Sequence, residues 1–250
     1  MVASSPSAYP HLSSSALDDL QADLTILLHQ TLSHRSLHPK NLGILPTKKS
    51  WLLNLDVLVL SDAGNILDAL FMASRAALWD TRVPRTRGVE YKARPRKAAE
   101  DTTAQGGRGD MDVDEDTQSG FDTRTIHKAT DFELPDYWDE GEPLDGRAQW
   151  PVSVTLNLEH PIHFLDATAQ EEAATPLRLL LAFSFPSSAS PVMQAMRMLG
   201  PGEPAPSHLK ELVKAGEQYA REISTALISK LKEEDIRRYQ KAREIFELHR

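Results

Sequence analysis

One long segment of this sequence lacks the residues that a hydrophobic core needs. Residues 92–149 run from a basic stretch through a Gly-rich stretch to an acidic stretch, with few apolar side chains. Such a segment cannot offset the entropy lost on ordering by burying apolar surface. We therefore predict that residues 92–149 are a disordered, low-complexity insertion, and that the folded domain is built from the residues on either side of it.

The residues before the insertion, 1–91, alternate between helical and strand patterns. A Ser-x-x-Asp signal at Ser15–Asp18 opens a stretch with apolar residues at helical spacing, which predicts a helix that ends before His38. Next, "WLLNLDVLVL" (residues 51–60) predicts a mostly buried strand, and "SDAGN" predicts a turn. A second helix should follow this turn. We expect one face of it to carry Leu67, Leu70, Phe71, Ser74, Ala77 and Leu78.

After the insertion, residues 150–231 predict more strands and a long helix. Apolar and polar residues alternate in "VSVTLNLE", as expected for a half-buried strand. "IHFLDA" and "LRLLLAFSF" also indicate strands, whereas "VMQAMRMLG" fits a strand or a helix. An amphipathic helix should occupy residues 209–231, and residues 232–250 predict a charged, solvated helical tail. The chain is therefore predicted to be an α+β protein.

Composition excludes several classes of protein. The formal net charge is −8 and the isoelectric point is about 5.6, which disfavours a free-standing nucleic-acid binder. The sequence has no cysteine, so disulfides, zinc ribbons and thiol nucleophiles are excluded. Neither a secretory signal nor a membrane span is indicated, and we expect a soluble protein of the cytosol or nucleus.

Three acidic residues follow a predicted strand in "HFLDATAQEEAAT": Asp166, Glu171 and Glu172. Oxygen ligands of this kind suit Mg²⁺. Carboxylates in the first turn of a helix also stabilise its positive end, and from the sequence pattern alone we favour this capping role. A separate basic stretch contains Arg82, Arg85 and Arg87, which are candidate RNA contacts, although a solvated basic run fits the composition equally well.

Two sequence blocks together carry a resemblance to a known family. "WLLNLDVLVLSDAGNILDALFMASRAALWDTRVP", followed by "FLDATAQEEA", resembles a ribonuclease PH-type domain of the kind found in ring subunits of the eukaryotic RNA exosome. The resemblance implies a ribonuclease PH-like fold of the ribosomal protein S5 domain 2-like β-α-β-α type. It covers about residues 5–216 without the insertion, and it begins late in the domain. We therefore expect an N-terminally incomplete fold.

The same resemblance implies the partners and the cellular location. Related ribonuclease PH-like subunits would form a six-membered hetero-oligomeric ring with this chain, and RNA-binding cap subunits and RNA would be further partners. No membrane partner is expected. The location implied is the nucleus, the nucleolus and the cytoplasm.

The resemblance also implies a degenerate catalytic site. Active members hold the attacking phosphate with an arginine in the turn Gly-Gly-Thr-Arg-Thr-Ala, and that position is Leu67 here. They carry two aspartates six residues apart, where this chain has Asp166 and Glu172. We therefore expect a non-catalytic subunit with no catalytic residue, no metal and no cofactor, which scaffolds 3′-to-5′ RNA processing and degradation. The alternatives are an active Mg²⁺-dependent phosphorolytic exoribonuclease that uses Asp166 and Glu172, and an orphan paralogue that joins no ring.

Overall fold

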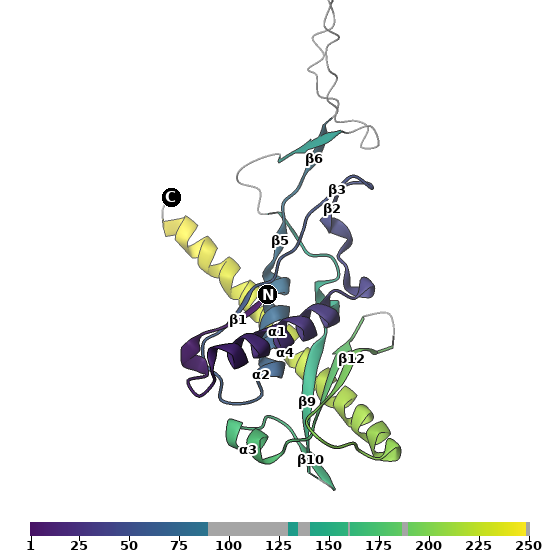
Figure 1. Ribbon diagram of the computed structural model, residues 1–250. Helices are drawn as coiled ribbons and strands as arrows, with labels where there is room; N and C mark the ends of the chain where they lie inside the picture. The colour runs from purple at the N-terminus through teal and green to yellow at the C-terminus, as the bar shows by residue number, and fades with distance from the viewer. Residues whose placement is uncertain (90–129, 135–140, 160, 187–189, 249–250) are drawn as a thin grey trace, which may run out of the picture. The chain divides into compact units, whose positions relative to one another are not determined.

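A computed structural model describes residues 1–89, 130–134, 141–159, 161–186 and 190–248 (Figure 1). The chain divides into two compact units. Unit 1 comprises Met1–Lys40, Leu53–Thr81 and Pro143–Arg250, and unit 2 comprises Asn41–Leu52 and Arg82–Glu142. None of the helices in the described residues is both long and apolar enough to cross a membrane.

The main sheet of unit 1 is antiparallel and has the strand order β10-β9-β11-β12. Its strands are β9 (Val152–Glu159), β10 (Ile162–Phe164), β11 (Arg178–Ser184) and β12 (Val192–Leu199). The strands predicted at "IHFLDA" and "LRLLLAFSF" are confirmed, and the ambiguous segment "VMQAMRMLG" is a strand.

Strand β9 is buried on both faces, which corrects the prediction of a half-buried strand. Its polar residues Ser153, Thr155 and Asn157 are as inaccessible as the apolar residues between them, with at most 2% of their surface exposed. The reason is that helix α2 (Ile66–Asp80) and helix α4 (Pro206–Leu248) both pack on this strand. The polar side chains therefore face the protein interior rather than water.

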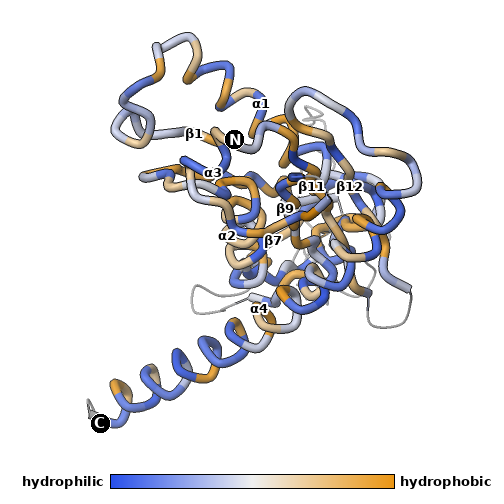
Figure 2. Tube along the Cα trace, turned by 90° about the horizontal axis from the view of Figure 1, so that it is seen from below, coloured by the Kyte–Doolittle hydropathy of each residue, from blue (hydrophilic) through white to orange (hydrophobic). Residues whose placement is uncertain are grey.

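Helix α4 covers the sheet on the side of the apolar residues of β9. Gly216 allows close packing there, since a Cβ atom at this position would lie 2.4 Å from a methyl carbon of Leu181. The helix continues to Leu248 without a break at residue 232, and its C-terminal half is mainly hydrophilic (Figure 2). The core under α4 contains Val152, Val154, Leu156, Leu158, Leu179, Leu181, Phe183, Leu212 and Ala220.

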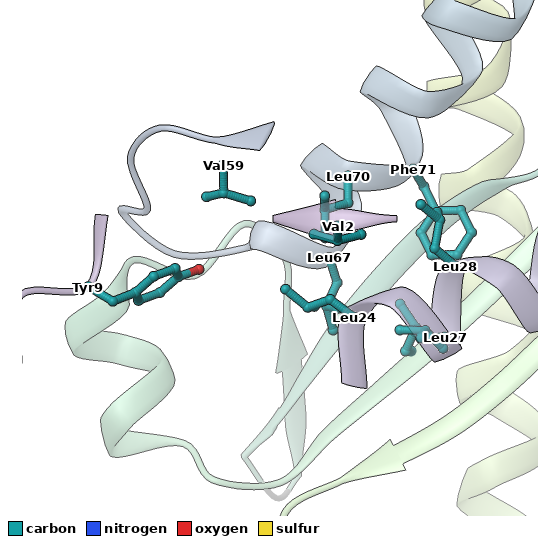
Figure 3. Packing of buried hydrophobic residues seen from close by; sticks show 10 residues of the cluster. Val2, Tyr9, Leu24, Leu27, Leu28, Val59, Leu67, Leu70 and Phe71 are labelled. Carbon is teal, nitrogen blue, oxygen red and sulfur yellow. The ribbon is translucent and has the colours of Figure 1, made fainter. Parts of the chain in front are cut away.

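A second core lies between α2 and helix α1 (Ser14–Leu32) (Figure 3). Both helices were predicted, although the N-cap of α1 is Ser13, whose side chain accepts from the Ala16 N–H, rather than Ser15. Ala77 was expected on the buried face of α2 but is exposed. The members of this core are Val2, Tyr9, Leu24, Leu27, Leu28, Val59, Leu67, Leu70, Phe71 and Leu180.

The predicted strand at residues 51–60 is much shorter than expected. Only Val57–Val59 form a strand, β4, which pairs in parallel with β1 (Val2–Ser4). Val59 is buried, whereas Leu58 and Leu60 are 61% and 69% exposed. The prediction of a mostly buried ten-residue strand is therefore wrong, because a short two-stranded sheet buries only one of its faces.

Unit 2 consists of short strand pairs. Strand β2 (Gly43–Leu45) pairs with β3 (Lys49–Ser50), β5 (Arg82–Val83) with β8 (Glu142–Pro143), and β6 (Arg87–Val89) with β7 (Asp131–Glu133). The remaining short elements of the chain are the helix α3 (Ala169–Ala174) and the 3-10 helices Pro6–Ala8, Arg35–Leu37, Lys40–Leu42 and Arg147–Gln149.

Part of the predicted insertion is ordered. Strands β7 and β8 and the 3-10 helix Arg147–Gln149 all fall within residues 92–149. The prediction of disorder is therefore wrong for these segments. Strands β7 and β8 are stabilised by short pairings with β6 and β5, and Arg147 of the 3-10 helix stacks over the Trp79 ring of α2 at 4.1 Å. Residues 92–129 and 135–140 lie outside the described residues.

Candidate functional site

Two loops that are about a hundred residues apart in the sequence meet in unit 1. One is the turn between β4 and α2, and the other connects β10 to α3. The Ala169 N–H donates to the Ala63 carbonyl oxygen at 2.8 Å. Gly64 has φ +113°, and a Cβ atom there would lie 2.3 Å from the Ala167 carbonyl oxygen. The close approach of the two backbones therefore requires glycine at this position.

Asn65 and Asp166 face each other across these loops. Both residues have positive φ, 52° and 54°, a conformation that Asn and Asp tolerate better than most residues. The Asn65 side-chain amide donates to Asp166 Oδ1 at 3.2 Å. Asp166 is the first acid of the predicted degenerate site. It is exposed, and its carboxylate accepts this hydrogen bond from the turn before α2.

Glu172 connects three segments of unit 1. Its Oε1 atom accepts the backbone N–H of Asn65, the N-cap residue of α2, at 3.0 Å. The same oxygen lies 2.9 Å from Nη1 of Arg178 on β11, and both side chains are about three-quarters buried or more, with 19% and 26% exposed. The carboxylate of Glu172 therefore stabilises the N-terminus of α2 and neutralises the Arg178 guanidinium.

Glu171 has a different role from its neighbour. It forms a capping box with Thr168, in which the Thr168 hydroxyl accepts the Glu171 N–H and the Glu171 carboxylate accepts the Thr168 N–H. The Thr168 hydrogen bonds lower the pKa of Glu171, the backbone one first. The predicted helix-capping role is confirmed for Glu171.

Leu67, where the family resemblance places a phosphate-binding arginine, is buried in the core between α1 and α2 (Figure 3). Its side chain contributes to packing and presents no polar atom to the loops. The structure thus brings the three predicted residues Leu67, Asp166 and Glu172 to one end of α2, but none of them is placed as an anion ligand.

Asp68 was not predicted to matter, yet it is the most deeply buried carboxylate near this site. Only 5% of its surface is exposed. It accepts the Ser153 hydroxyl at 2.8 Å and the Thr155 hydroxyl and N–H at 3.0 Å each. Burial raises the pKa of Asp68, and these hydrogen bonds act in the opposite direction. The sequence feature that could have indicated a buried acceptor is the row of polar residues on β9, but the alternating pattern assigns these residues to solvent.

Tyr9 and Asp62 were also missed by the sequence analysis. The Tyr9 hydroxyl donates to Asp62 Oδ2 at 2.7 Å, and Asp62 Oδ1 accepts the Gly64 N–H at 2.8 Å. Burial, followed by the interaction with Asp62, raises the pKa of Tyr9. Asp62 and Glu172 therefore hold the same tight turn, each by accepting one of its backbone N–H groups.

The candidate RNA contacts lie in unit 2. Arg82 is in β5 and Arg87 in β6, and Arg85 lies between these strands and pairs with Glu142 at 3.2 Å. All three residues are exposed. In the part of the chain that the structure describes, no group of three or more His, Cys, Asp and Glu side chains is placed to hold a metal ion.

Comparison with known proteins identifies the type of domain. Residues 3–84 match the 3′ exoribonuclease family, domain 1. Over 48 residues, 19% of this chain and 15% of the relative, the chain is 43% identical to a putative exosome complex exonuclease RRP42 of Dictyostelium discoideum. Over 81 residues, 32% of this chain and 30% of the relative, it is 33% identical to the exosome complex component Rrp42 of Sulfurisphaera tokodaii. The matched segments thus span less than a third of either relative.

Solved structures show the same fold at low sequence identity. An archaeal exosome core aligns over 91% of this chain and 67% of its own, with a TM-score of 0.53 and 17% identity. An Archaeoglobus fulgidus exosome with RNA bound to the active site aligns over 90% and 68%, with a TM-score of 0.56 and 18% identity. The chain therefore has a ribonuclease PH-like fold, and it resembles the exosome component Rrp42, ribosomal RNA-processing protein 42.

Proposed function

We propose that this chain is a non-catalytic ring subunit of the RNA exosome, which scaffolds 3′-to-5′ processing and degradation of ribosomal and other RNAs. Its neighbours would be related ribonuclease PH-like subunits in a six-membered ring, with RNA-binding cap subunits and RNA as further partners. The nucleus, nucleolus and cytoplasm are the proposed locations. The fold and the similarity to two Rrp42 proteins support membership of such a ring.

The non-catalytic proposal rests on the residues at the N-terminus of α2, where no side chain is placed to hold a phosphate ion among the described residues Leu67, Asp166 and Glu172. Phosphorolysis needs an inorganic phosphate held in line with the scissile phosphodiester, and a bidentate guanidinium is the group best suited to hold it. Leu67 is a buried isobutyl group at that position. The nearby Arg178 already pairs with Glu172, whose carboxylate also takes the Asn65 N–H.

The active alternative would have to accommodate the partners that Glu172 already has. Both contacts use Oε1, which accepts the Asn65 N–H and lies 2.9 Å from Arg178 Nη1. A cation shared by Glu172 and Asp166 would therefore lie close to the Arg178 guanidinium, whose positive charge repels it. The arrangement observed thus favours a scaffold.

Ring entry can be tested by reconstitution. We would co-express the full chain with ribonuclease PH-like exosome subunits and purify through a tag on one of those subunits. The proposal predicts stoichiometric co-purification of this chain in a particle of ring size. Recovery of an assembled ring that lacks this chain, with the chain itself folded in the flow-through, would instead support an orphan paralogue.

A further inference from the structure

The β2–β3 hairpin of unit 2 presents two consecutive lysines on a strained turn. Lys48 and Lys49 follow Thr47, which has φ +60°. A β-branched residue rarely adopts this conformation, and such strain is common at functional sites. The turn is held by the Lys48 N–H, which donates to the Leu45 carbonyl at 3.1 Å. Residues 46–50 are all exposed.

An aromatic pair lies directly beside these lysines. The rings of Trp51 and Phe132 are 5.8 Å apart between centroids and inclined at 74°, and both side chains are only partly buried. The backbone N–H of Trp51 donates to the Leu42 carbonyl at 2.8 Å, which extends the backbone pairing of the hairpin to Trp51. Lys49 Nζ lies 5.4 Å from the centroid of the Phe132 ring.

The cross-strand neighbour of Phe132 leaves space on one side of the ring. Phe132 on β7 pairs with Gly88 on β6, so no side chain covers it from the partner strand. Arg87, next to Gly88, pairs with Glu133 and points to the opposite face of the two strands, so it is not part of this surface. A planar group could therefore approach the open side of the aromatic pair with the hairpin lysines beside it.

The described residues of unit 2 carry more basic than acidic side chains. They contain five Lys and Arg against three Asp and Glu, whereas the complete chain has a net charge of −8. The Lys49–Asp131 ion pair, at 2.7 Å, has both side chains substantially exposed, 43% and 61%. Exposed ion pairs are weak, so a phosphate could replace Asp131 as the partner of Lys49.

We propose that the hairpin lysines Lys48 and Lys49 and the Trp51–Phe132 pair form a binding surface for single-stranded RNA. The bases would stack against the aromatic rings, and the lysines would contact phosphates. Exposed cations beside partly open aromatic rings fit single-stranded nucleic acid better than a duplex, whose bases are already stacked. This inference takes from the proposed function only that the chain works on RNA.

The test measures binding of a fluorescently labelled oligouridine to the full chain by anisotropy over a range of salt concentrations. Trp51→Leu removes the ring but keeps an apolar side chain, and it should weaken binding about fivefold to a hundredfold. Trp51→Tyr, which restores an aromatic ring, should bind nearly as well as the unaltered chain. Lys49→Gln should lower the slope of log affinity against log salt by about 0.7. The matched control Lys210→Gln removes an exposed lysine from α4 and should change neither quantity.

Several results would overturn this proposal. They are equal binding by Trp51→Leu and the unaltered chain, equally tight binding of a duplex of the same length, or an equal effect of Lys49→Gln and Lys210→Gln. If Trp51→Leu fails to fold, Trp51→Tyr and Lys49→Gln still decide the question. Ring entry is measured on the same preparations, so a failure of this site is distinguishable from a failure of the proposed function. Loss of ring entry in Trp51→Leu with unchanged RNA affinity would assign the surface to a subunit contact instead.

Discussion

The buried carboxylate of Asp68 should be one of the most sensitive positions in the fold. It is the acceptor for three donors on β9, namely the Ser153 hydroxyl and the Thr155 hydroxyl and N–H. Each buried donor left unsatisfied costs about 1–3 kcal/mol. The two hydroxyls can partly reorient, but the backbone N–H cannot. We therefore expect Asp68→Ala to lower the free energy of unfolding by about 3–5 kcal/mol, and Asp68→Asn, which keeps one acceptor oxygen, by about 1–3 kcal/mol.

The pH dependence of this effect has a defined sign. Because burial raises the pKa of Asp68 above its ordinary value of 3.8, the folded chain holds the Asp68 proton more tightly than the unfolded chain. The contribution of Asp68 to stability is therefore largest below pH 3.8, and it falls as the pH rises through the raised folded value. The penalty of Asp68→Asn should accordingly be larger in acid than at neutral pH.

Urea unfolding followed by tryptophan fluorescence measures these differences, since Trp79 and Trp150 are both buried in unit 1. Asp23→Asn, a matched loss of an exposed carboxylate on α1, should change stability by no more than about 0.5 kcal/mol. A loss of less than about 1 kcal/mol for Asp68→Ala would refute the hydrogen-bond argument. If the loss of unfolding free energy in Asp68→Asn grew as the pH rose, the conclusion that burial raises the pKa of Asp68 would be wrong.

Three further predictions concern other positions. Glu172→Ala should cost about 1–2 kcal/mol in the same unfolding assay, and a double-mutant cycle with Arg178→Ala should show coupling, whereas no coupling would mean that their ion pair contributes nothing. Arg75 is 1% exposed, and its guanidinium donates to the Ser224 hydroxyl and the Ala148 carbonyl, with no carboxylate partner among the described residues; burial lowers its pKa to about 10. Arg75→Met should therefore be neutral or stabilising, whereas Arg75→Ala should cost about 3 kcal/mol or more; equal losses would contradict this. Deletion of residues 94–120 should leave co-purification with ring subunits unchanged, and loss of assembly would show that the segment is structural.

Strong hydrophobic periodicity in the sequence predicted most of the elements in unit 1. The strand at 178–184 and the helices at 14–32 and 66–80 were expected because their apolar residues recur at strand or helix spacing. Periodicity failed at β9, because it assigns alternate polar residues to solvent. It contains no information about Asp68, which supplies a buried acceptor for Ser153 and Thr155 from another element.

The candidate site was less predictable than the fold. Asp166 and Glu172 were selected because of a family resemblance, but their partner Asn65 is about a hundred residues away, and no local pattern indicates that contact. The buried Arg75 was missed for a similar reason. An arginine within an apolar helix face looks like a solvated residue until Ser224 of α4 is placed beside it. Short strands such as β7 also escape periodicity, because three residues are too few to show a repeat.

The central claim is that this chain is a scaffold without phosphorolytic activity. The most direct measurement is the phosphate-dependent release of nucleoside diphosphates from single-stranded RNA, by the chain alone and within a ring whose other subunits are inactive. We predict no release in either case, and no effect of Asp166→Ala on RNA decay by the complete complex, because Leu67 offers phosphate no ligand and Glu172 is held by Arg178 and Asn65. A phosphate-dependent activity that Asp166→Ala abolishes, while ring assembly stays intact, would contradict the account and establish the enzyme in its place.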